Sequence, residues 1–183
     1  MNCIELMVEE HKNIKRMLRV IRKYCYRLLK GDDIDYNDFY KIIDFIRNYA
    51  DKHHHGKEES MLFNRMSENM GPVAEQIIKH GMLVEHDQGR LYIHDLEAAM
   101  NKLIEGDDEA KLDVIANAMS YTYLLSRHID KEDNAVYKFA QGKLPKEVMD
   151  SINKECREFE QAAENNSVQN KYIELLNELE QQV

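Results

Sequence analysis

The sequence is poor in residues that interrupt helices and in residues that cross-link chains. Its 183 residues include only 7 glycines and 2 prolines, and tryptophan is absent. This scarcity, beside plentiful Glu, Lys, Leu, Ile, Met and Ala, predicts an all-α protein. The 3 cysteines are odd in number and form no CxxC pair, so they indicate neither a disulfide framework nor a thiolate metal site.

Long apolar runs and an excess of positive charge are also missing. The uninterrupted apolar stretches are far shorter than the ~20 residues that span a bilayer, and the N-terminus has no signal-peptide pattern. We therefore expect a cytoplasmic protein. The formal net charge of -9 argues against nonspecific binding to nucleic acid or to an anionic membrane, because both surfaces repel an acidic protein.

Clusters of Gly, Pro and Asp divide the chain near residues 28–38, 68–75, 105–111 and 141–147. The short connections predict antiparallel neighbours, and hence an up-down-up-down four-helix bundle with additional C-terminal helices. We assign the bundle to residues 1–141 and a helical extension packed on it to residues 142–183, within one domain. The alternative role for the extension is a homodimer contact.

Each of the four long segments carries an apolar stripe at the helical period, and a histidine interrupts every stripe. In the second and fourth segments a glutamate follows the histidine at i+4, on the same face and one turn away. The residues in this pattern are His11, His54, Glu58, His86, His128 and Glu132. A lone His followed by HxxxE occurs twice, which predicts a site with near two-fold symmetry.

The four histidines are also predicted to lie at one height in the bundle. Residue counts from each histidine to the next turn, and from that turn to the next histidine, agree in every pair of neighbouring helices. His80 and His94 lie roughly 9 and 12 Å along the axis from His86 and miss this layer. His53 and His55 flank His54 at about 100°. We expect these four to be solvated or to support the ligands from outside.

Two glutamates in an apolar stripe point to a metal. Burying each carboxylate without partners would cost several kcal/mol, which a metal cluster compensates. Four imidazoles and two carboxylates are too many ligands for one zinc and too rich in nitrogen for magnesium or calcium. Two non-haem iron ions, joined by both glutamates and an oxo or hydroxo bridge, fit the set and leave one position open on each. Such open sites suit dioxygen, peroxide or nitric oxide.

Other polar residues near the histidines receive weaker assignments. Glu10, Glu59, Glu85 and Asp133 are expected mostly on a solvated face, because adjacent residues on a helix point about 100° apart. Tyr121 is favoured as a core tyrosine over a hydrogen-bond donor to the metals. A ferritin-like di-iron site requires Glu-x-x-His on two helices, and this motif does not occur in the chain.

The runs EEHKNI, HHHGKEESMLF, EHDQGR and RHIDKEDNAVY resemble the hemerythrin HHE cation-binding family, over about residues 4–141. Carried over position by position, the resemblance implies the same six ligands. Oxygen-carrying members have a fifth histidine where this chain has Met82, and their last carboxylate corresponds to Asp133. Glu132 shares the stripe of His128, which favours it over Asp133. The pattern looks more like HHE proteins associated with nitric oxide, oxidative stress or repair of damaged iron centres.

These observations predict a di-iron protein that binds, senses or reduces O2, peroxide or NO in an oxidative or nitrosative stress response. They leave the electron donor open, and they are compatible with binding alone or with enzymatic turnover. An iron donor or repair factor for damaged iron centres is the first alternative. The second is a metal-free helical signalling module, for instance a histidine phosphotransfer protein, which would need one exposed histidine.

Overall fold

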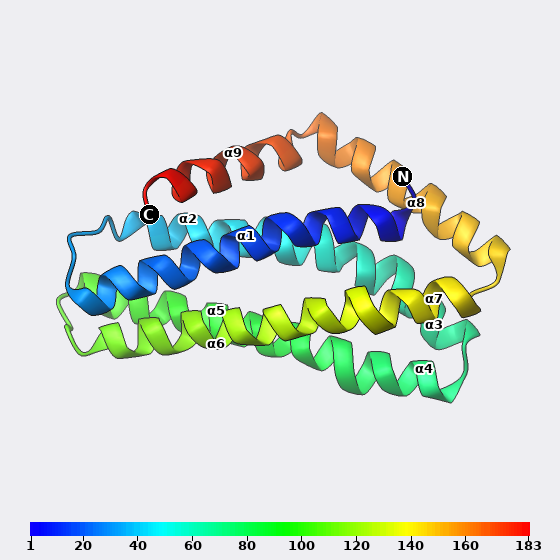
Figure 1. The fold of residues 1–183 in the computed structure, drawn as a ribbon, viewed down its shortest axis with the longest axis horizontal. Coiled ribbons are helices and arrows are strands. Elements are labelled where there is room, and N and C mark those ends of the chain that lie inside the picture. Colours follow the sequence, from blue (N-terminus) through cyan, green and yellow to red (C-terminus); the bar gives the residue numbers. More distant parts are fainter.

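The computed structural model describes residues 1–183 and contains only helices, turns and short connections. Four long helices form an antiparallel bundle, and two further helices lie across one side of it (Figure 1). The first long helix is α1 (Cys3–Lys30); the second joins α2 (Asn37–Phe45), η1 (Ile46–His55), η2 (Glu58–Phe63) and α3 (Asn64–Asn69). The third joins α4 (Pro72–Ile77), η3 (Ile78–Met82) and α5 (Leu83–Ile104), and the fourth joins α6 (Ala110–Lys131), η4 (Glu132–Val136) and α7 (Tyr137–Lys143). The all-α, up-down-up-down prediction is confirmed.

The helices begin and end where the sequence predicted breaks. Asn2 caps α1 through a capping box with Glu5, and Gly31 ends it with a φ of 76°. Gly71, with a φ of 78°, separates the second long helix from the third, and Pro72 opens the latter. None of the helices combines the length and apolar character needed to cross a lipid bilayer.

The C-terminal helices α8 (Lys146–Asn165) and α9 (Val168–Gln181) cover the first and second long helices. Figure 1 shows them in orange and red above α1 and α2. Ile152 and Cys156 of α8 are buried against one end of the bundle, and Tyr172 and Leu176 of α9 against the other. Within one chain, the C-terminal extension thus packs on the bundle.

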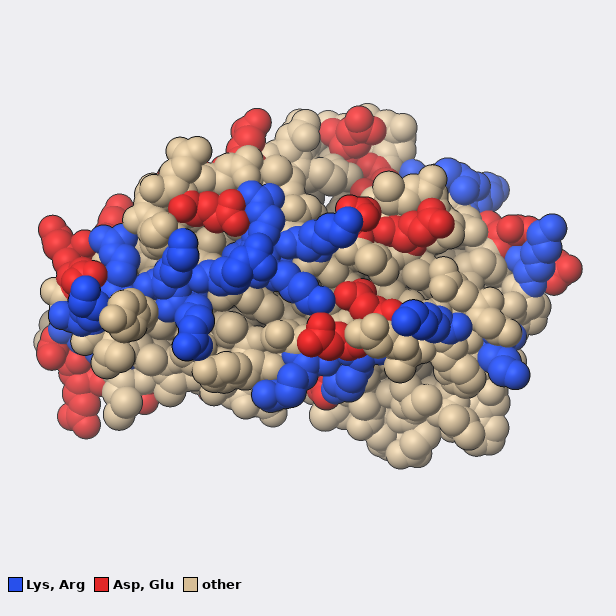
Figure 2. Space-filling model, in the orientation of Figure 1, with Lys and Arg blue, Asp and Glu red and all other residues tan.

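The apolar core is divided in two along the bundle axis. One cluster of 29 buried residues includes Ile21 and Leu96, and a second cluster of 15 includes Met7 and Met82. Between them lies the layer of histidines, so water is kept away from that layer at both ends. Figure 2 shows Lys and Arg side chains gathered on the face where α1 lies in Figure 1.

Four segments, η1 to η4, are π-helical, with i→i+5 hydrogen bonds and one extra residue in the turn. In the second, third and fourth long helices they contain the histidine of the layer or lie within a few residues before or after it. Each wide turn shifts the following side chains around the helix. Near this layer, the direction in which a side chain points therefore differs from the direction that the α-helical period predicts.

Candidate metal centre

The structure brings all six residues of the predicted set together in the middle of the bundle. Their side chains come from all four long helices and are almost wholly buried. Glu132 lies between two histidines, with Oε2 3.4 Å from Nε2 of His11 and Oε1 3.0 Å from Nε2 of His128. Oε2 of Glu58 lies 3.8 Å from Nε2 of His54 and 3.5 Å from Nε2 of His86. Glu132 thus faces the histidines of the first and fourth long helices, and Glu58 faces those of the second and third.

Several polar atoms at this centre have no hydrogen-bond partner. They are Nε2 of His11, Nε2 of His54, Oε2 of Glu58 and both carboxylate oxygens of Glu132. A buried polar atom without a partner costs about 1–3 kcal/mol. Five such atoms facing one space, all of them nitrogen or oxygen lone-pair donors, fit a site for bound cations.

The outer ring nitrogens of the four histidines, in contrast, are all paired with carboxylates. Each Nδ1–H donates to an acid on a neighbouring helix at 2.7–2.8 Å. The pairs are His54 with Glu10, His86 with Glu59, His128 with Glu85, and His11 with Asp133. Because a carboxylate only accepts, Nδ1 carries the proton and Nε2 presents its lone pair inward. This tautomer is the one that binds a metal through Nε2.

These pairs form a closed ring around the bundle. Each long helix supplies one acid to the histidine of the next, and the fourth helix supplies Asp133 to the first. Each acid is the sequence neighbour of an inward-facing residue, so the 100° between adjacent residues turns it toward the adjoining helix. The expectation that these four acids belong mostly to a solvated face is wrong.

His86 and His128 approach each other most closely, with 3.0 Å between their Nε2 atoms. Two lone pairs at this distance repel unless a proton or a cation lies between the rings. Two nitrogens bound at right angles to one metal would be about 3 Å apart, given metal–nitrogen bonds of about 2.0–2.1 Å. Burial lowers the pKa of His128, but Glu132 and Glu85 outweigh it and raise the pKa to about 9.

The two central glutamates also favour a cation. Burial and the charge of Glu132 raise the pKa of Glu58 well above its ordinary value. For Glu132, burial acts in the same direction, but His128 and His11 outweigh it and lower the pKa. Two adjacent carboxylates in an apolar layer are both ionised readily only when additional positive charge is bound between them.

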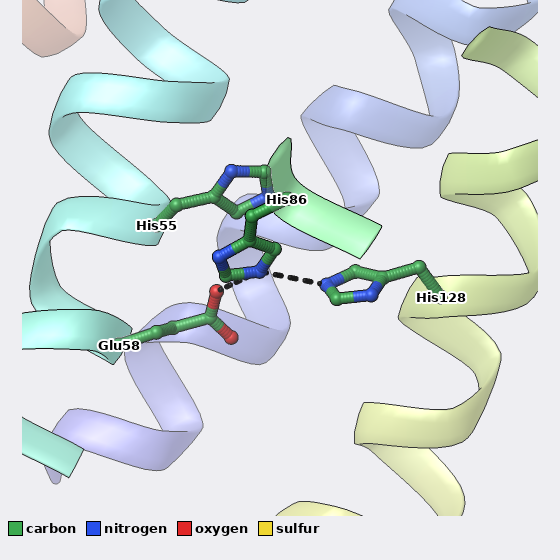
Figure 3. Close-up of side chains that lie close together, drawn as sticks. All are labelled: His55, Glu58, His86 and His128. Carbon is green, nitrogen blue, oxygen red and sulfur yellow. Dashed lines mark hydrogen bonds and ion pairs between the residues drawn. The ribbon is translucent and has the colours of Figure 1, made fainter. Parts of the chain in front are cut away.

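His55 lies closer to the centre than the sequence indicated. It is buried, and its ligand-type atoms lie within 4.8 Å of those of Glu58, His86 and His128. Figure 3 shows its ring stacked on that of His86, with centroids 3.8 Å apart and planes 10° apart. A metal lies in the plane of the imidazole that binds it, so two stacked rings with nearly parallel planes do not both point at one ion. We therefore keep His55 outside the proposed ligand set.

The other three histidines outside the set differ in their exposure to solvent. His80 and His94 are exposed, as the count along the axis predicted. His53 is buried, and its ring packs against Phe159 of α8. For His53 and His55 the solvated alternative is thus wrong, because the second long helix is covered on three sides by α1, α5 and α8.

Tyr137 was missed by the sequence analysis. It is buried, its ring stacks on His11, and its hydroxyl donates a hydrogen bond to Oε1 of Glu58. On an uninterrupted α-helix it would point about 180° away from His128. The extra residue in the π-helical turn η4 brings it round to the centre. Its sequence signal is its place at the end of the run RHIDKEDNAVY.

A cavity of about 120 Å³ adjoins the centre. Its lining includes His55, His86, Gly89, Tyr121 and Leu125. Tyr121 thus lies at the cavity wall, with its ring against Gly89. Such a volume accommodates a small molecule and excludes a metabolite-sized substrate, for which pockets measure about 300–1,000 Å³.

Comparison with known proteins agrees with the geometry. A family model described as the hemerythrin HHE cation binding domain matches residues 2–140. A search of curated proteins gave no match. The matched residues include the first three long helices, the fourth as far as Ala140, and all six residues of the predicted set. The chain therefore belongs to the hemerythrin HHE cation-binding domain family, and its buried His and Glu clusters fit a metal site.

Proposed function

We propose that this chain is a non-haem di-iron protein that binds a small oxidising molecule such as O2, peroxide or NO. The ligands are His11, His54, Glu58, His86, His128 and Glu132. The observation that carries the proposal is the set of five buried, unpartnered donor atoms at the meeting point of four helices. Bound iron would supply redox-active positions at which such a molecule can accept electrons.

The chain's own residues prepare this centre in three ways. The ring of acids fixes the tautomer and orientation of each histidine, as carboxylate partners do at metal sites. Tyr137 holds Glu58 through its hydroxyl. The two apolar clusters exclude water from above and below, and the cavity beside His86 offers space for a small molecule next to the centre.

The direct test is metal analysis and optical spectroscopy of protein purified without oxygen. We expect about two irons per chain and ultraviolet–visible bands that change on adding O2, NO or azide. An iron-loaded protein whose spectrum is unaffected by all three would contradict the proposal. His54→Ala should abolish these bands, whereas His94→Ala, which changes an exposed histidine, should leave them intact.

An iron donor or repair factor is a second candidate, and one observation favours it. Met82, in the place of the fifth histidine of the oxygen carriers, is buried in the apolar cluster and offers no nitrogen. A centre with four histidines gives the iron one nitrogen ligand fewer than a centre with five. Fewer protein ligands favour release of the iron. Transfer of iron to an apo acceptor under reducing conditions would support this role, and retention of the iron would contradict it.

We also propose that the protein acts in an oxidative or nitrosative stress response in the cytoplasm. An external donor would supply its electrons. A phosphotransfer module would have to use His80 or His94, which are exposed, because the histidines at the centre of the bundle are buried.

A further inference from the structure

A second polar cluster lies on the outer side of His54. Its centre is Lys57, whose side chain is wholly buried and forms ion pairs with Glu10 and Glu160. Nε2 of His53 lies 3.2 Å from the Lys57 ammonium, 3.0 Å from Oε1 of Glu10 and 3.3 Å from Oε1 of Glu160. Through Glu10 this cluster is directly joined to His54, whose Nδ1–H donates to Oε2 of Glu10 at 2.7 Å.

Glu160 is the member of this cluster that lies outside the family match. It belongs to α8, whereas the match ends at residue 140. Gln169 of α9 donates a hydrogen bond to its Oε2 at 2.8 Å, so both C-terminal helices hold the carboxylate in place. The extension thus contributes one charged group to the surroundings of the bundle centre.

A third metal site is the competing explanation, because Glu10, His53 and Glu160 place ligand-type atoms within 4.8 Å of one another. The ammonium group of Lys57, however, already lies among them and contacts all three. None of the three has a buried side-chain atom without a partner, unlike the residues at the bundle centre. The cluster is therefore complete with its own cation.

We propose that Glu160 is a positioning residue for the metal centre, acting on His54 through Lys57 and Glu10. By sharing the Lys57 charge, Glu160 leaves Glu10 enough negative charge to accept strongly from the His54 Nδ1–H. Without it, the ammonium pairs with Glu10 alone, and the hydrogen bond that orients His54 weakens. This inference rests on the proposed function in one respect: it takes His54 as a ligand.

The test is Glu160→Gln in the full chain, which keeps the side-chain size and removes the charge. In the iron-loaded protein we expect about tenfold faster loss of iron to a chelator, at the low end of the 10–100-fold effects of such partners. The optical bands should also shift. In the metal-free protein, ¹H–¹⁵N NMR of labelled histidine should show a weaker hydrogen bond at Nδ1 of His54.

Glu155→Gln is a matched control. Glu155 also lies on α8 and also bridges to the second long helix, through Nη2 of Arg65 at 2.7 and 2.8 Å, but it has no contact with the histidines. It should weaken the contact between α8 and the second long helix while leaving the iron loss, the bands and the His54 signal unchanged.

The outcomes separate the two proposals. Equal effects of Glu155→Gln and Glu160→Gln would overturn the positioning role, since docking of α8 alone would explain them. An unchanged His54 signal in Glu160→Gln would overturn it as well. If the wild-type protein binds no iron but the His54 signal changes only in Glu160→Gln, the proposed function fails while the link from Glu160 to His54 stands.

Discussion

Asp133 accepts a hydrogen bond from Nδ1 of His11 at 2.7 Å and thereby joins the last long helix to the first. Its neighbour Glu132 faces the other nitrogen of the same ring. The two acids that the sequence offered for one role therefore have different positions: one is central and fully buried, and the other is at the rim.

This difference gives the first prediction. Glu132→Gln should lose at least one iron per chain, because it removes the negative charge of a donor that faces both His11 and His128. Asp133→Asn should keep two irons but bind them about 10–100-fold more weakly, since it alters only the support of His11. Iron stoichiometry and competition with a chelator measure both effects. The opposite pattern would make Asp133 the ligand.

Tyr137→Phe removes the hydroxyl that donates to Glu58 and keeps the ring that stacks on His11. We expect the metal-free protein to lose about 1–3 kcal/mol of unfolding free energy, the usual effect of leaving a buried acceptor without its donor. Urea unfolding measures this loss. Tyr26→Phe is the control, because Tyr26 is largely exposed, and it should change stability little. Equal stability of the two variants would argue against the hydrogen bond.

Gly89 lines the cavity, where it has no side chain to occupy space. A Cβ atom at this position would lie 3.5 Å from Cε2 of Tyr121, an ordinary contact, so Gly89→Ala should be tolerated. Gly89→Leu should fill much of the cavity of about 120 Å³ and slow the binding of azide or NO severalfold without lowering the iron content. Stopped-flow spectroscopy measures the rates. Unchanged binding in Gly89→Leu would show that small molecules enter elsewhere.

The ion pair between Asp51 and Arg90 at the cavity rim should depend on pH. Burial acts to raise the pKa of Asp51, but hydrogen bonds from His55 and Arg90 outweigh it, so the pKa is lowered in the folded state. An acid with a lowered folded-state pKa stabilises the fold above its unfolded pKa of about 3.8, and this contribution is lost as the pH falls below that value.

Asp51→Asn should therefore be less stable than wild type at pH 7, by about 1 kcal/mol or less because Arg90 is partly exposed. The difference should shrink as the pH is lowered from 5 toward 3, as measured by urea unfolding. Asp87→Asn removes an exposed partner of the same arginine and should show little effect at either pH. A difference between wild type and Asp51→Asn that does not vary with pH would contradict the assignment.

The sequence by itself determined the fold class and indicated six residues that the structure brings together at the centre of the bundle. Apolar stripes at the helical period, with turns at Gly31 and Gly71, are local patterns, and they yield four antiparallel helices. The single height of the four histidines follows from residue counts, because the rise per residue of a helix is fixed.

The tertiary structure alone decided how the neighbours of those residues are used. Adjacent residues diverge by about 100°, and the sequence does not say which helix lies in that direction, so the ring of acids and the burial of His55 were not predicted. The π-helical turn η4 rotates Tyr137 inward against the α-helical period. The contact of Glu160 with Lys57 joins residues 103 positions apart, and such pairing depends on how α8 packs on the bundle.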